Sequence, residues 1–94
     1  MVIEVLGNQA RTEILHRLRQ ESRSASALAA ELDLSRSSVH RHLLALEEQG
    51  YVIADVSPED RSHRQSTAHW SINAPAIEAA IKTWLEYAAG TAPD

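Results

Sequence analysis

The 94-residue sequence contains no cysteine and no phenylalanine. Without cysteine, the chain can form no disulfide, no thiolate metal site and no cysteine nucleophile. Without phenylalanine, Leu, Ile, Val and Ala must fill most of the core, and we expect Trp70 and Trp84 to be its bulkiest members. A chain of this length predicts a single domain over 1–94, with a modest core that would benefit from a partner.

Long apolar runs are also missing from the sequence. No segment approaches the roughly 20 residues that a membrane-spanning helix needs. The segment after Met1 lacks the pattern of a signal peptide. We therefore expect no membrane partner and a cytoplasmic location.

The formal net charge is −4. A general nucleic-acid coat is expected to be strongly basic, so this sum argues against that function. The distribution of charge is more informative. Residues 35–46 and 61–72 each hold two arginines and no acidic residue, and four of the five histidines lie in the same two stretches. Two locally cationic surfaces on an acidic chain favour a sequence-selective binder.

Apolar spacing and capping residues predict three helices in the first third of the chain. A short apolar helix spans about 2–6, and Asn8 caps an amphipathic helix over about 9–20. After a polar turn that ends at the capping residue Ser24, a third helix covers about 25–32.

A fourth helix over about 36–49 follows a tight turn and a serine cap. Asp33 occupies a turn position that favours glycine, and Asp is one of the few other residues that tolerate a positive φ there. Ser35 caps the helix and Gly50 ends it. Residues 25–49 therefore predict a helix-turn-helix.

Residues 51–72 predict a β-hairpin, or wing. Two β-prone segments, about 51–56 and 65–72, flank the turn signal Ser-Pro-Glu-Asp. Asn73 is the expected cap of a last helix over 74–89, and residues 90–94 are expected to form a frayed tail. The predicted fold is mostly α with a small β-hairpin, a winged helix-turn-helix in the order α-α-α-α-β-β-α.

The helix over 36–49 has the pattern of a DNA-recognition helix. At about 100° per residue, Val39, Leu43 and Leu46 form a narrow inward stripe. The opposite face is polar, and no acidic residue lies between Asp33 and Glu47. Arg36 and Ser37 lie in the first turn, the end that approaches base edges in helix-turn-helix docking.

We predict two groups of DNA contacts from this helix. The base-reading candidates are Arg36, Ser37, His40 and Arg41. The candidates for phosphate contact or helix capping are Ser35, Ser38 and His42. An ordinary solvated face is the alternative for the set, and a place at the core edge is the alternative for His42. Leu44, apolar on the polar side, could meet a thymine methyl, a partner subunit or nothing.

The wing supplies a second set of candidate contacts. Arg61, His63 and Arg64 are placed for phosphates or the minor groove, as at the tip of a winged-helix hairpin. Glu59 and Asp60 lie at the same tip, so a local ion pair is an equal alternative.

The order of elements and two motifs resemble the winged-helix repressors of the ArsR/SmtB type. The opening LGNQARTEILHRL is similar to that family's first signature, in which a short helix ends in Leu-Gly-Asn and an Arg precedes Ile-Leu. The segment LSRSSVHRHLLALEEQGYV is similar to its recognition helix with the terminal glycine. The resemblance covers residues 2–89 and implies a DNA-binding regulator.

The resemblance also implies a homodimer built from the first and last helices, 1–6 and 74–89. The implied interface residues are Val2, Ile3, Leu6, Ile77, Ile81, Trp84, Leu85 and Ala88. The family's metal sites cannot be carried over, because the chain has no cysteine and its last helix has no histidine. We therefore expect no metal and no cofactor.

The remaining function classes are weaker. His40 and His42 lie about 200° apart on one helix and cannot share a metal ion. No nucleophile elbow, phosphate-binding glycine loop or paired apolar carboxylates suggest an enzyme. We predict a sequence-specific regulator that binds double-stranded DNA, a dimeric repressor of a palindromic operator. The alternatives are a protein-interaction module and an architectural or recombination accessory factor.

Overall fold

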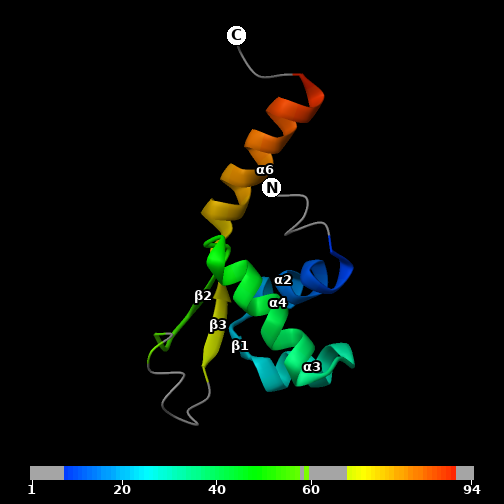
Figure 1. Ribbon diagram of the computed structural model, residues 1–94, viewed down its shortest axis with the longest axis vertical. Helices are drawn as coiled ribbons and strands as arrows, with labels where there is room; N and C mark the ends of the chain where they lie inside the picture. The colour runs from blue at the N-terminus through cyan, green and yellow to red at the C-terminus, as the bar shows by residue number, and fades with distance from the viewer. Residues whose placement is uncertain (1–7, 58, 60–67, 91–94) are drawn as a thin grey trace.

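The computed structural model describes residues 8–57, 59 and 68–90. Within these residues the chain runs through helices α2 (Gln9–Gln20), α3 (Ala25–Leu32), α4 (Arg36–Glu48) and α6 (Ala74–Ala89), and strands β1 (Arg23–Ser24), β2 (Val52–Ala54) and β3 (His69–Ile72). Helices α2, α3 and α4 pack together on one side of the sheet (Figure 1). Helix α6 projects from the end of the molecule that lies opposite α3. The predicted helix over 2–6 lies outside the described residues.

Serine and asparagine side chains start three of the helices as the sequence predicts. Asn8, Ser24 and Ser35 each accept a hydrogen bond from the backbone N–H three residues ahead, at 3.1 Å. Each bond satisfies one of the first-turn donors that have no partner inside the helix. These three capping predictions are confirmed.

Two residues with positive φ end helices α3 and α4. Asp33 has a φ of 55°, and the following Leu34 N–H donates to Ala29 O at 3.0 Å. Gly50 has a φ of 80°, and the N–H groups of Gly50 and Tyr51 donate to Glu47 O and Leu46 O. The chain can therefore reverse sharply into α4 and leave it directly for the sheet.

Among the described residues, the sheet has three strands in the order β1-β3-β2, and both pairings are antiparallel. The predicted wing is confirmed as a pairing of β2 with β3, in the register Val52↔Ile72. The prediction that a polar turn runs up to Ser24 is wrong in part, because Arg23 and Ser24 form a strand that pairs with Trp70 and His69. The sequence Arg-Ser has no strand pattern of its own, so the pairing with β3 is what makes β1 a strand.

The core lies where α2, α3 and α4 meet the sheet. Trp70 of β3 is its largest member and is 1% exposed. The other buried residues are Ile14, Leu18, Leu28, Ala29, Val39, Leu43, Leu46, Tyr51 and Val52. The prediction that Trp84 joins this core is wrong: it is only partly buried, because α6 extends past the body of the domain.

Asn73 connects the start of α6 to the end of α4. Its N–H donates to Tyr51 O at 2.8 Å, and its side-chain Nδ2 donates to Gly50 O at 2.9 Å. The predicted cap at Asn73 is therefore wrong in its chemistry, because the side chain does not bond the first turn of α6. The amide instead satisfies a carbonyl at the end of the neighbouring helix.

Candidate nucleic-acid interface

Helix α4 is oriented by its buried stripe. Val39, Leu43 and Leu46 are each fully buried, and they pack between α2, α3 and the sheet. Burial of such side chains contributes roughly 1.5–3 kcal/mol each. Because all three lie on one side of α4, the opposite side must face solvent.

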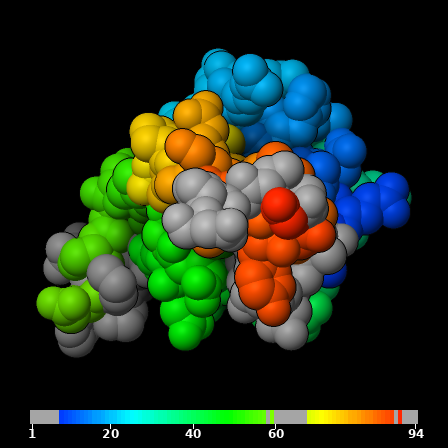
Figure 2. Space-filling model, turned by 90° about the horizontal axis from the view of Figure 1, so that it is seen from above, coloured from blue at the N-terminus to red at the C-terminus, as the bar shows by residue number. Residues whose placement is uncertain are grey.

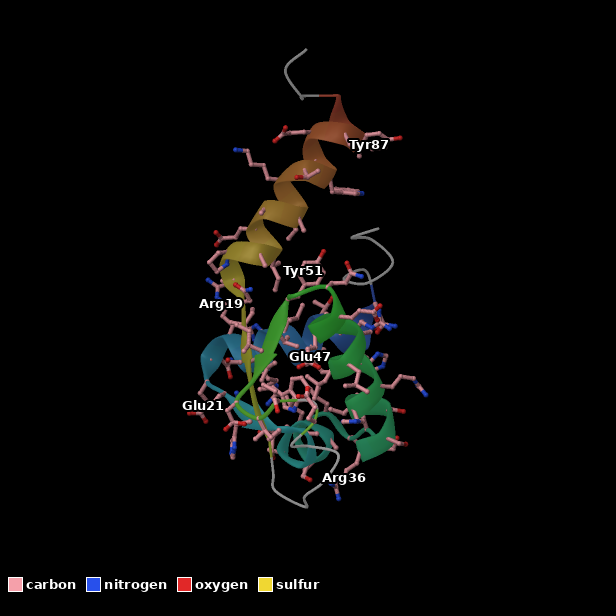
Figure 3. All side chains as sticks on the ribbon, turned by 60° about the vertical axis from the view of Figure 1, so that its left-hand side comes forward. Arg19, Glu21, Arg36, Glu47, Tyr51 and Tyr87 are labelled. Carbon is pink, nitrogen blue, oxygen red and sulfur yellow. The ribbon has the colours of Figure 1, made fainter. Side chains whose placement is uncertain are left out.

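The exposed side of α4 carries the four predicted base-reading residues. Arg36, Ser37, His40 and Arg41 are all exposed, and the first turn contains no acidic residue. Figure 3 shows Arg36 at the end of the helix that lies farthest from α6. The structure therefore brings these four side chains onto one accessible, locally cationic face.

A shallow hollow lies beside the first turn of this face. Arg36, Ser37 and His40 line it together with Ala25 of α3, and its volume is about 350 Å³. The hydroxyls of Ser35 and Ser37 lie 3.3 Å apart at its edge. The two helices of the helix-turn-helix therefore present their N-terminal ends side by side.

His42 differs from the other predicted contacts. It is partly buried on the side of α4 that faces α2, and its Nδ1 accepts a hydrogen bond from Arg11 Nε at 3.0 Å. Burial, then the charges of Arg11 and Arg41, lower the pKa of His42 below its ordinary value of 6.5. His42 is therefore a neutral acceptor at the core edge, the alternative that the sequence left open.

Arg23 and Glu31 form a connection that the sequence analysis missed. Arg23 Nε donates to Glu31 Oε2 at 2.9 Å, and Arg17 donates to Glu31 Oε1 at 3.1 Å. Arg23 also donates to the main-chain carbonyls of Arg17 and Glu21, at the end of α2. The carboxylate of α3 is thereby fixed to the end of α2, which sets the position of the helix-turn-helix.

Asp55 holds the two wing strands together where β2 ends. Its Oδ1 accepts the N–H of His69 at 2.8 Å, and its own N–H donates to His69 O at 3.0 Å. The predicted contacts at the wing tip lie outside the described residues; these are Arg61, His63 and Arg64.

Helix α6 has one packed face and one open face. Ala76, Ile77 and Ala80 pack against the core. Ile81 and Leu85 are 43% and 47% exposed. Figure 2 views the molecule from the α6 end and shows part of the orange and red surface of α6 near the centre.

A hollow marks the open face of α6. Ile81 and Leu85 line it together with Glu78, Lys82 and Glu86, and its volume is about 430 Å³. Tyr87, which was not among the predicted site residues, lies about 200° around the helix from Leu85 and is 81% exposed near the far end of α6 (Figure 3). The other predicted interface residues, Val2, Ile3 and Leu6, lie outside the described residues.

The first half of the chain, α2 through β2, carries the features that define its family. Residues 8–54 match the family described as bacterial regulatory protein, arsR family. The chain belongs to this family. The match spans the whole helix-turn-helix, and it confirms the resemblance drawn from the two sequence motifs. An ArsR-family chain is a winged-helix DNA-binding domain of a transcriptional regulator, and the family is not a class of enzymes.

Solved structures of ArsR-like regulators share the fold. The ArsR-like transcriptional regulator from Rhodococcus sp. RHA1 has a TM-score of 0.72 at 27% identity, over 96% of this chain and 77% of that one. Reduced HlyU from Vibrio cholerae has a TM-score of 0.67 at 24% identity, over 92% of this chain and 82% of that one. The homodimeric winged helix-turn-helix DNA-binding domain of Mb0332 from Mycobacterium bovis has a TM-score of 0.66 at 22% identity, over 99% of this chain and 79% of that one. No curated protein sequence matches the chain.

Two searches of the described residues bear on other kinds of site. In residues 8–57, 59 and 68–90, no three histidine or carboxylate side chains are grouped so that they could hold a metal ion. None of the helices in the same ranges is long and apolar enough to cross a membrane.

Proposed function

We propose that this ArsR-family chain is a homodimeric repressor that occupies a palindromic operator through α4. One observation carries the proposal: the fully buried stripe of α4 turns Arg36, Ser37, His40 and Arg41 outward on a face whose first turn carries no acid. A helix of this kind fits the major groove, where arginine can donate two hydrogen bonds to guanine and serine can serve several bases.

The neighbouring polar residues have supporting functions in this proposal. Ser35 caps α4, and Ser38 is half-buried beside it, so both lie where backbone phosphates pass the start of the helix. Arg61, His63 and Arg64 remain the proposed phosphate or minor-groove contacts of the wing. We assign His42 to the support of α4, because its Nδ1 is bonded to Arg11.

The second half of the proposal is a two-fold dimer through α6. Ile81 and Leu85 are exposed large apolar side chains on one face, beside the partly buried Trp84. The Mycobacterium bovis domain with the same fold is homodimeric. A two-fold axis at α6 would place two copies of α4 about one turn of DNA apart, ~34 Å, as a palindrome requires. Ala88 and residues Val2, Ile3 and Leu6 complete the proposed interface, and Ile77, which packs against the domain's own core, lies at its edge.

Charge reversal on α4 tests the DNA-binding half. We expect Arg41→Glu to abolish specific binding, because it replaces a cation with an anion beside the phosphates. Arg19→Glu makes the same charge change at an exposed position of α2 and is the matched control. Affinity of both variants for a duplex selected by the wild type is measured by fluorescence anisotropy. Equal affinities would contradict the assignment of α4.

A charge on α6 tests the dimer. We expect Trp84→Glu to yield monomers in sedimentation, because a carboxylate would be buried without a partner at the interface. Ala79→Glu adds the same charge at an exposed position of α6 that does not line the hollow beside Ile81 and Leu85; it is the control and should stay dimeric. A Trp84→Glu variant that still sediments as a dimer would remove α6 from the interface.

A further inference from the structure

The contact between Arg11 and His42 connects two helices that are far apart in sequence. Arg11 lies in the first turn of α2, and His42 lies midway along α4, 31 residues later. The bond joins Arg11 Nε to His42 Nδ1 over 3.0 Å and is partly buried. It therefore links a supporting helix directly to the helix that carries the DNA-facing residues.

The geometry requires a neutral imidazole. Nδ1 can accept the Arg11 N–H only with its lone pair free, so the ring proton must be on Nε2. In the part of the chain that the structure describes, the charged groups that act on the ring are Arg11 from α2 and Arg41 from α4 itself, and both oppose a second positive charge. A protonated ring would have no acceptor for Arg11 and would place two cations within hydrogen-bond distance.

The contact lies where it can control the rotation of α4. Val39, Leu43 and Leu46 fix the depth of the helix, but together they span only an arc of about 60°. His42 lies about 40° outside the Leu46 edge of this arc. A bond at that flank resists rotation of the helix about its own axis. Such a rotation would move Arg36, Ser37 and Arg41 across the DNA-facing side.

We propose that Arg11 and His42 form a positioning contact that fixes the rotation of α4, and that protonation of His42 releases it. The proposal rests on the DNA-reading function assigned above to α4. Specific DNA binding by the wild type should therefore weaken on acidification, through the loss of this bond rather than through a change in phosphate contacts.

Two variants isolate the contact. His42→Asn keeps an acceptor close to the position of Nδ1 but cannot be protonated. Arg11→Met keeps much of the apolar stem and removes the donor. His16→Asn is the matched control, because it removes an exposed imidazole of α2 whose Nε2 lies 3.5 Å from Gln20 Nε2 of the same helix. Each protein is titrated by anisotropy with a duplex selected by the wild type at about pH 7.5, at several pH values above and below 6.5.

The expected pattern separates a positioning contact from a phosphate contact. On acidification, wild type and His16→Asn should lose about three- to tenfold in affinity relative to His42→Asn, the size of one hydrogen bond. The comparison is made between variants because the histidines proposed to face DNA, His40 and His63, are the same in all three proteins. Arg11→Met should bind weakly at every pH. The log–log salt slope of Arg11→Met should equal that of the wild type. A slope whose magnitude is smaller by about 0.9 in Arg11→Met would make Arg11 a phosphate contact and overturn the proposal. The proposal would also be overturned if His42→Asn responded to pH as the wild type does.

An NMR titration of the free protein tests the same contact without DNA. The amides of Arg36 and Ser37 lie more than one turn from His42, and we expect them to shift as His42 titrates in the wild type but not in His42→Asn. Failure to select any duplex would refute the proposed function alone, and the NMR result would then decide the contact. Amides that stay unmoved while His42 titrates would refute the contact.

Discussion

Removal of the Arg23 guanidinium should destabilise the helix-turn-helix more than removal of any exposed arginine. The side chain of Arg23 is 13% exposed and bonds both the carboxylate of Glu31 and two carbonyls at the end of α2. Arg23→Met is the informative change, because methionine keeps most of the apolar stem and loses all five donors.

The magnitude follows from what is left behind. A hydrogen bond to a charged group contributes about 1.5–3 kcal/mol, and each bond to a neutral carbonyl about 1 kcal/mol. The loss is partly compensated, since Glu31 keeps its bond to Arg17 at 3.1 Å and its side chain is 30% exposed to water. We therefore expect the free energy of unfolding to fall by about 2–3 kcal/mol.

Urea denaturation, monitored by circular dichroism, measures this loss of stability. All variants are compared at one protein concentration, because the stability of a dimer depends on the protein concentration. Arg19→Met is the matched control, and since Arg19 is exposed on α2 we expect a change within about 0.5 kcal/mol. Arg23→Lys should fall between the two, because an ammonium cannot span both helices with a planar fork. If Arg23→Met unfolds within 0.5 kcal/mol of the wild type, then the network does not stabilise the fold and the reasoning is wrong.

Two further predictions concern the core and pH. Leu43→Ala, at a fully buried position, should lower the free energy of unfolding by about 2–5 kcal/mol in the same assay, whereas Leu44→Ala, at a 41% exposed one, should change it little. Because the folded-state pKa of His42 lies below 6.5, the unfolded state binds the proton more readily, so stability should fall as the pH drops through 6.5 toward the lowered value. His42→Asn should lose that part of the pH dependence, and an unchanged profile would count against the Arg11–His42 bond.

The sequence predicted the features that local chemistry decides. The stripe Val39, Leu43 and Leu46 follows from helical period alone, and all three are fully buried. The caps and the positive φ of Asp33 depend on neighbouring residues, which makes them visible in a short window. The outward face of α4, and with it the base-reading candidates, followed from the same period.

Features that depend on distant pairing were not predictable. Strand β1 exists because Arg23 lies opposite Trp70, which comes 47 positions later in the chain. Arg11–His42 and Arg23–Glu31 join residues whose types suggest ordinary surface charges. Trp84 showed the limit of periodicity, since the spacing predicted an apolar face but could not say whether the domain's own core reaches it.

Selection of bound duplexes from random double-stranded DNA tests the central claim most directly. We expect an enriched palindrome whose two half-sites lie about one helical turn, 10–10.5 base pairs, from centre to centre. Binding to that duplex should fall with salt along a linear log–log slope and should be lost in Arg41→Glu. Enrichment of no sequence, or of a single half-site bound by a monomer, would contradict a dimeric reader built on α4 and α6.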